Sequence, residues 1–153
     1  MARELANNQE QQKNSSYASA FIAGKATDPA IFFGQPMNPQ TLSGWVTDPA
    51  ARRKYVEAFE RSSFDGMLAY YKQNYPRGDS PNAAPSAPRL TMPVLIFHGL
   101  EDTALHSDGL NNTWDWIDAD TTIVTAPGAG HFVQQDAAEL VTNTLKWWLM
   151  ARP

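Results

Sequence analysis

The sequence predicts an α/β fold in which a helical region precedes two strand–helix units of a parallel sheet. Two observations predict this order. Residues 93–153 contain two short apolar runs, each followed by a helical pattern, whereas residues 1–76 show only helix and loop patterns. Residues 77–92 are rich in Pro and Ala, and closely spaced prolines neither continue a helix nor enter a central strand. We therefore expect a helical region, a linker and a sheet-containing core.

The helical region opens with residues 3–21, which predict one helix because they are rich in Glu, Gln, Ala and Lys and contain no Gly or Pro. Gly24 is expected to end this helix. Further along, Asp48 and Pro49 predict a second helix start, with Asp48 as the N-cap and Pro49 at the first helical position.

A third short helix is expected over residues 65–74. It contains Tyr70 and Tyr71, which are consecutive and therefore point about 100° apart around the helix axis. One of these rings can face a cavity while the other packs in the body of the region.

The core region should contain two strands, over residues 94–98 and 122–125. The first reads VLIFH, and such a continuous apolar run is typical of a parallel-sheet strand buried on both faces. Two strands alone are too few for a stable parallel sheet, which needs neighbours and cover on both faces. The chain therefore resembles a part of a larger sheet.

Helices should follow both strands of the core. Ser107 can cap a helix that carries Leu110, Trp114 and Ile117 at helical spacing. Residues 136–150 predict the last helix, whose apolar stripe consists of Ala137, Val141, Leu145 and Trp148. Four tryptophans on these helices are expected to be packing groups: Trp114, Trp116, Trp147 and Trp148.

The overall composition excludes several classes of function. The 153 residues carry a net charge of −4, with Lys and Arg scattered, so we expect no nucleic-acid partner. The chain has no Cys, and its three His lack H-x-x-x-H spacing, so we expect no metal and no other cofactor. No signal peptide or membrane-length apolar run occurs. We therefore expect no membrane association and a cytoplasmic location.

Two turns that follow the strands carry residues suited to catalysis. His131 follows the second strand through P-G-A-G, whose glycines allow a tight turn over the strand end, where ligands of open α/β sheets bind. Asp102 follows the first strand, with Glu101 as the weaker candidate. A carboxylate that binds one imidazole nitrogen fixes the tautomer and stabilises the charged ring. The alternatives are an ordinary loop histidine and a solvated turn.

The remaining histidines are expected to play other roles. His98 lies at a buried strand end and is expected to be structural. His106 could line the mouth of a site, but surface exposure is the favoured interpretation.

These motifs resemble a known family. PVLIFHGLEDTAL and PGAGHFVQQD are similar to the C-terminal motifs of α/β-hydrolases, especially the epoxide-hydrolase-like branch. Acid before histidine is the later half of the family order of nucleophile, acid and histidine. The resemblance implies that residues 1–76 form a helical cap region and residues 93–153 the C-terminal part of the hydrolase core. His131 would be the base and Asp102 its orienting acid.

The resemblance extends to two cap tyrosines. YASAFIAGKA is similar to the cap segment that carries the first ring-opening tyrosine, which would be Tyr17. FDGMLAYYKQNYPR is similar to the cap motif tryptophan-tyrosine-arginine-asparagine, with Tyr71 as the matching tyrosine. Three of the four motif residues differ here, since the sequence reads Tyr-Tyr-Lys-Gln. Both tyrosines could instead simply pack on apolar helix faces.

The first half of the family pattern is not found in the sequence. No G-x-S-x-G, G-x-D-x-G or G-x-C-x-G motif occurs, so we expect a truncated hydrolase whose nucleophile lies outside these 153 residues. The complete enzyme would hydrolyse a small hydrophobic epoxide or ester through a covalent intermediate; dehalogenase activity stays open. This chain alone is expected to be inactive. The alternative is a non-catalytic fragment or binding module that pairs with a separate N-terminal hydrolase half.

Overall fold

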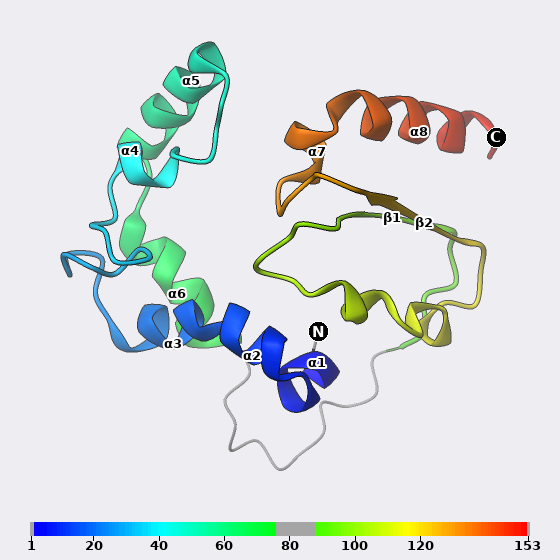
Figure 1. Ribbon diagram of the computed structural model, residues 1–153, viewed down its shortest axis with the longest axis horizontal. Coiled ribbons are helices and arrows are strands. Elements are labelled where there is room, and N and C mark those ends of the chain that lie inside the picture. The colour runs from blue at the N-terminus through cyan, green and yellow to red at the C-terminus, as the bar shows by residue number, and fades with distance from the viewer. Residues whose placement is uncertain (1, 76–87, 153) are drawn as a thin grey trace. The chain divides into compact units, whose positions relative to one another are not determined.

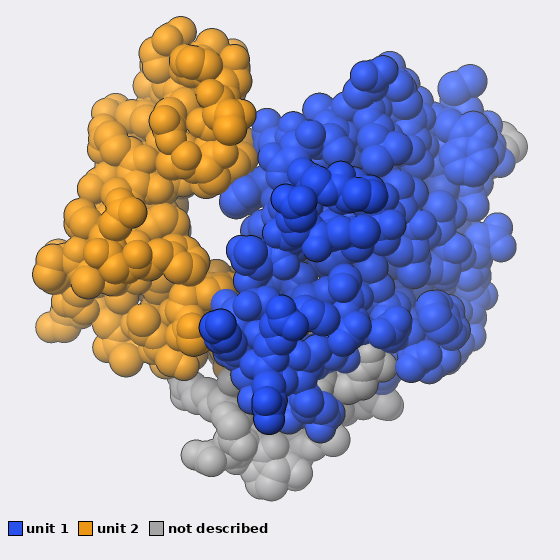
Figure 2. Space-filling view, in the orientation of Figure 1, with its two compact units in different colours: residues 1–14, 80–153 blue, residues 15–79 orange. Residues whose placement is uncertain are grey.

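The computed structural model describes residues 2–75 and 88–152. The chain divides into two compact units, Met1–Asn14 with Ser80–Pro153 as unit 1 and Ser15–Asp79 as unit 2, which Figure 2 shows in blue and orange. The first fourteen residues of the predicted helical region thus cluster with the sheet-containing part. The predicted boundaries of that region, the linker and the core stay predictions, and most of the predicted linker lies outside the described residues.

Unit 1 begins with two short helices, α1 (Ala2–Asn7) and α2 (Gln9–Asn14). The prediction of one helix over residues 3–21 was wrong, because the chain starts a new helix at Asn8. The Asn8 side-chain oxygen accepts hydrogen bonds from the N–H groups of Glu10 (3.0 Å) and Gln11 (3.1 Å), as an N-cap does. A local side-chain bond therefore outweighs the helical propensity of the surrounding residues.

The sheet of unit 1 has two parallel strands, β1 (Val94–Gly99) and β2 (Thr121–Ala126), as predicted (Figure 1). Their register runs from Val94 opposite Thr121 to Gly99 opposite Ala126. The apolar residues of β1 are only half-buried rather than buried on both faces. Among the described residues, β1 also has a neighbouring strand on one side only.

The segment between the strands forms two short 3₁₀ helices, η1 (Ser107–Leu110) and η2 (Thr113–Trp116). The predicted single helix was wrong, because Asn112 adopts a left-handed conformation with φ of 60° that ends helical winding. The cap is also not the expected Ser107. The His106 side chain accepts a hydrogen bond from the N–H of Asp108 instead.

The C-terminal helix is divided into α7 (Val133–Asp136) and α8 (Ala138–Met150), where one helix was predicted over residues 136–150. Helix α8 runs along the two strands (Figure 1), and the Trp148 indole N–H donates to the Thr122 hydroxyl at 3.3 Å. The stripe residue Leu145 is exposed.

The tryptophans of unit 1 do not all pack as predicted. Trp114, Trp116 and Trp147 are exposed, whereas Trp148 is half-buried. The prediction was wrong for the first three, because no described part of unit 1 covers the faces on which they lie.

The last residues of the predicted linker are tied to the sheet unit. Leu90 forms an isolated parallel bridge with Ile117, which is buried. The Arg89 guanidinium pairs with the Asp118 carboxylate at 2.7 Å and also donates to the Asp115 carbonyl. Residues 88–92 therefore extend the packing around the start of β1.

Unit 2 is helical and contains α3 (Ser16–Ala23), α4 (Pro39–Leu42), α5 (Pro49–Glu60) and α6 (Phe64–Asn74). Gly24 ends α3 and Asp48 caps α5 through the N–H of Ala51 (2.6 Å), both as predicted. Helix α6 starts one residue earlier than predicted, with Ser63 as its cap. The buried core of the unit consists of Phe21, Ile31, Met37, Leu42 and Leu68.

The helices have one further property that bears on function. Within the described ranges, none of them is long and apolar enough to cross a membrane.

Candidate catalytic site

Asp102 and His131 lie in the turns that follow β1 and β2. Because the two strands are parallel and in register, both turns leave the same edge of the sheet. The Asp102 Oδ2 atom lies 3.0 Å from the His131 Nδ1 atom. The structure thus brings together the two residues that the sequence singled out, although their catalytic role stays a prediction.

Both oxygen atoms of the Asp102 carboxylate form hydrogen bonds. Its Oδ1 atom accepts hydrogen bonds from the N–H groups of Ala104 (2.7 Å) and Leu105 (2.9 Å), while Oδ2 meets His131. The side chain is only 5% exposed. Burial raises the pKa of Asp102, but the bonds from Leu105, His131 and Ala104 together outweigh burial and leave this pKa below its ordinary value. Asp102 is therefore ionised at neutral pH.

His131 is positioned to act as a base through its other ring nitrogen. An ionised Asp102 can only accept a hydrogen bond, so the neutral His131 ring carries its proton on Nδ1. The Nε2 atom then keeps the lone pair. The side chain is 44% exposed, so water can reach the ring. Phe132 packs edge-to-face against the ring at a centroid distance of 5.2 Å.

Backbone contacts join the two turns. The Glu101 N–H donates to the carbonyl of Ala129 at 2.9 Å, and Gly99 lies directly against the same carbonyl. Gly128 has a φ of 76°, which favours glycine, and the Gly130 N–H donates to the Asp136 carboxylate at 2.8 Å. The turn that carries His131 is thus fixed from both sides.

Of the two adjacent acids, only one reaches the histidine. Asp102 contacts His131, whereas the Glu101 side chain is exposed and contributes through its backbone. The preference for Asp102 over Glu101 therefore agrees with the geometry.

The other two histidines lie away from this pair. His98 is buried at the end of β1, as expected. His106 is not on the surface as expected but half-buried, because its Nε2 atom lies 3.2 Å from the Glu10 carboxylate and its Nδ1 atom 3.4 Å from that of Asp108.

The two predicted cap tyrosines are neighbours in unit 2. The rings of Tyr17 and Tyr71 lie 6.0 Å apart in an edge-to-face arrangement, and both pack against Phe21 of the unit 2 core. Tyr70, the adjacent tyrosine, is 64% exposed. Tyr71 packs in the body of unit 2 as expected for one of the two rings, whereas a cavity faced by the other ring stays a prediction. The ring contacts explain packing, whereas hydrogen-bond donation from the two hydroxyls stays a prediction.

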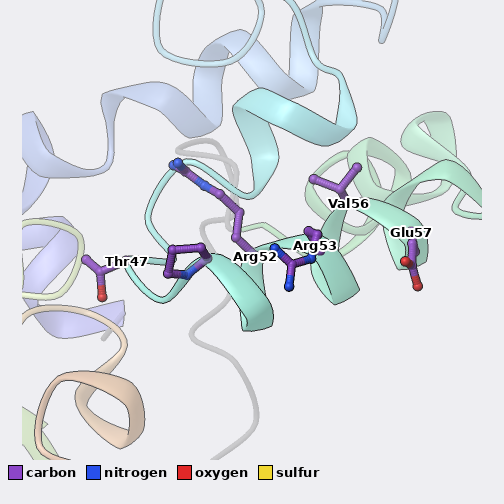
Figure 3. A pocket seen from close by; sticks show the side chains of 6 residues that line it. Thr47, Arg52, Arg53, Val56 and Glu57 are labelled. Carbon is purple, nitrogen blue, oxygen red and sulfur yellow. The ribbon is translucent and has the colours of Figure 1, made fainter.

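Unit 2 also contains a shallow hollow of about 410 Å³ beside α5 (Figure 3). It holds none of the predicted site residues. Its lining is formed by Thr47, Pro49, Arg52, Arg53, Val56 and Glu57.

Sequence reasoning missed Gln11 of α2. Its side chain is fully buried and binds the loop that follows Asp102, through the carbonyl of Ala104 and the N–H of His106. The surrounding glutamines and asparagines gave no signal that one of them would be buried. Within the part of the chain that the structure describes, no group of His, Asp and Glu is suited to hold a metal ion.

A pair of acid and histidine at the ends of two parallel strands, followed by a C-terminal helix, places the chain in a class: it has the fold of the C-terminal part of an α/β-hydrolase. Its structural neighbours are epoxide hydrolases of this superfamily. A point mutant of an epoxide hydrolase from Bacillus megaterium matches with a TM-score of 0.75 and 23% identity, over 96% of this chain and 55% of that one. A structure described as novel epoxide hydrolases from metagenomes of hot environments matches with a TM-score of 0.74 and 26% identity, over 95% and 53%.

A curated relative points in the same direction. Epoxide hydrolase A of Mycobacterium tuberculosis is 27% identical over 127 residues, which are 83% of this chain and 39% of that protein. No protein-family profile matches the chain. The chain therefore spans about half, or less, of the length of the proteins to which it is similar.

Proposed function

We propose that this chain supplies the water-activating half of an epoxide-hydrolase-like active site. The observation that carries the proposal is the contact of 3.0 Å between Asp102 and His131 at the ends of β1 and β2. The similarity to epoxide hydrolases supports the assignment of the substrate as an epoxide or a related ester. The nucleophile would come from residues outside the 153 of this sequence.

The proposed reaction has two steps. A carboxylate nucleophile attacks one epoxide carbon and the carbon–oxygen bond breaks. The phenols of Tyr17 and Tyr71 donate hydrogen bonds to the departing oxygen, and one of them passes its proton to that oxygen and becomes a phenolate. The product is a covalent ester with the carboxylate. An opening alkoxide needs such donors because it is strongly basic.

In the second step the ester is hydrolysed. The Nε2 atom of His131 takes a proton from water, and the resulting hydroxide attacks the ester carbonyl to form a tetrahedral intermediate. Asp102 stabilises the imidazolium that forms, since it stays ionised and bonded to Nδ1. His131 gives its proton to the alcohol oxygen as the intermediate collapses, which releases the diol and restores the neutral ring. The carboxylic acid of the nucleophile then loses its proton, which returns to the phenolate through water.

The half-buried strand β1 favours a second candidate function, a non-catalytic module that pairs with a separate hydrolase half. An unpaired strand edge readily accepts another strand. The coding sequence upstream of Met1, read in the same frame, distinguishes these two candidate functions. A frame with a G-x-D-x-G turn supports an enzyme part, and its absence supports the module.

Activity gives the direct test. The purified chain should not turn over an aryl epoxide, and it should do so once it is joined to the nucleophile-bearing half. His131→Ala in the joined enzyme should abolish turnover and leave the covalent ester to accumulate, detectable by mass spectrometry. Turnover in the joined enzyme that survives His131→Ala would contradict the proposal. Robust turnover by the chain alone, lost in His131→Ala, would refute the external nucleophile.

A further inference from the structure

Gln11 has a buried side-chain amide whose nitrogen and oxygen both form hydrogen bonds. The side chain is 0% exposed. Its Nε2 atom donates to the carbonyl of Ala104 at 2.8 Å, and its Oε1 atom accepts from the N–H of His106 at 2.6 Å. A buried amide group that lacks a hydrogen-bond partner destabilises the folded chain. The side chain and the loop therefore fix each other.

The loop that Gln11 binds is also the loop that binds Asp102. Ala104 uses both of its backbone groups for this purpose: its carbonyl accepts from Gln11, and its N–H donates to Asp102 Oδ1 at 2.7 Å. The other oxygen of Asp102 meets His131. A continuous series of hydrogen bonds therefore leads from α2 to the imidazole, and all of its members belong to unit 1.

We propose that Gln11 is a positioning residue for the pair of Asp102 and His131. By fixing residues 104–106, it holds the Asp102 carboxylate in the orientation in which Oδ2 faces Nδ1. Such outer partners set the tautomer and orientation of a functional imidazole. The inference rests on the proposed function in one respect, since the pair matters for catalysis only if His131 is the base.

The alternative is that Gln11 contributes only to folding. The two roles differ in one observable, the tautomer of His131. If the loop orients Asp102, the neutral ring carries its proton on Nδ1 as long as Gln11 is present. A purely structural amide would lower stability when it is removed, but would leave the tautomer of the folded chain unchanged.

The experiment compares Gln11→Met, which keeps similar length without the amide, and Gln11→Ala with the parent chain of 153 residues. Gln12→Met is the matched control, since Gln12 is the exposed neighbour and its side chain binds the carbonyls of Leu5 and Ala6 in its own part of the chain. Nitrogen NMR of the neutral His131 ring reports the tautomer, and thermal unfolding reports the fold. Asp102→Asn shows the signal expected when the carboxylate is lost.

We expect the fraction of His131 rings protonated at Nδ1 to fall by about half or more in the folded Gln11 variants, toward the Asp102→Asn signal. The Gln12 control should match the parent chain. An unchanged tautomer in a folded Gln11 variant overturns the proposal. Unfolding of both Gln11 variants, with a folded control, also overturns it, because the role is then structural. These outcomes do not depend on turnover, so a failure of the proposed function is seen separately, in the activity of His131→Ala.

Discussion

Gly99 lies against the carbonyl oxygen of Ala129, with no room between them for a side chain. A Cβ atom on Gly99 would meet the carbonyl oxygens of both Ala129 and Gly130, which are backbone atoms that cannot rotate away. The end of β1 and the turn before His131 therefore approach each other as closely as they do only because residue 99 is glycine.

Gly99→Ala should therefore destabilise the chain and separate the acid from the histidine. We expect a loss of about 1–3 kcal/mol in the free energy of unfolding, as for other overpacked sites. Urea unfolding measures it. Gly109→Ala is the control, because a Cβ there meets nothing closer than the Glu4 Cγ atom at 3.9 Å. Equal effects of the two substitutions would show that the contact at Gly99 is not tight.

Asp102 should make stability depend on pH in the acid range. Its pKa is lowered in the folded chain, so ionised Asp102 stabilises the fold above its unfolded pKa of about 3.9, and this contribution is lost as pH falls through the folded value. The parent chain should exceed Asp102→Asn in stability at neutral pH, and the difference should shrink in acid. Urea unfolding over a pH series measures both. The control Gln12→Met, which changes no ionisable group at an exposed site, should keep a constant difference from the parent chain across the series. A difference between the parent chain and Asp102→Asn that stays constant down the series would contradict the prediction.

The two cap tyrosines should act through their hydroxyl groups. In the enzyme joined to its nucleophile-bearing half, the double change Tyr17→Phe and Tyr71→Phe should slow ester formation on the order of 10²-fold, because the opening oxygen loses its donors. Single-turnover kinetics measures this step. Tyr70→Phe is the matched control, since its exposed ring adjoins Tyr71 in the same helix. If the double variant and the control both react at the parent rate, the tyrosines serve packing alone.

The cap of α5 should be a local determinant of unit 2 stability. Asp48→Ala removes the acceptor of the Ala51 N–H and should cost about 1 kcal/mol. Asp48→Ser should restore most of this loss, because serine is an equally good N-cap. Thermal or urea unfolding measures both variants. A serine variant as unstable as the alanine variant would show that charge, rather than capping, matters at this position.

The sequence was sufficient to predict features that depend on local chemistry. The two strands, the end of α3 at Gly24 and the cap at Asp48 all follow from neighbouring residues, and the structure has them. The pairing of Asp102 with His131 was also predictable, because parallel strands bring the turns after them to one edge.

Other features depend on contacts that no short pattern encodes. The burial of Gln11 is one of them, because it depends on a loop about ninety residues later in the chain. The break at Asn8 is local, but the cap that its side chain provides for α2 competes with the helical propensity of its neighbours, which favours a continued helix. The exposure of Trp147 follows from the absence of cover on its face among the described residues, which no helical pattern reveals.

The register of the two strands has a consequence for how such a chain can change in evolution. Gly99 is opposite Ala126, and Asp102 and His131 follow these residues at fixed distances along the chain. A single inserted or deleted residue within either strand would move one turn by about 3.3 Å relative to the other. This shift is about as large as the distance of 3.0 Å between the Asp102 and His131 side chains, so it would break their contact. Length changes should therefore be tolerated between η1 and η2, at Asn111 and Asn112, and rejected within β1, within β2 and in the two turns that follow them.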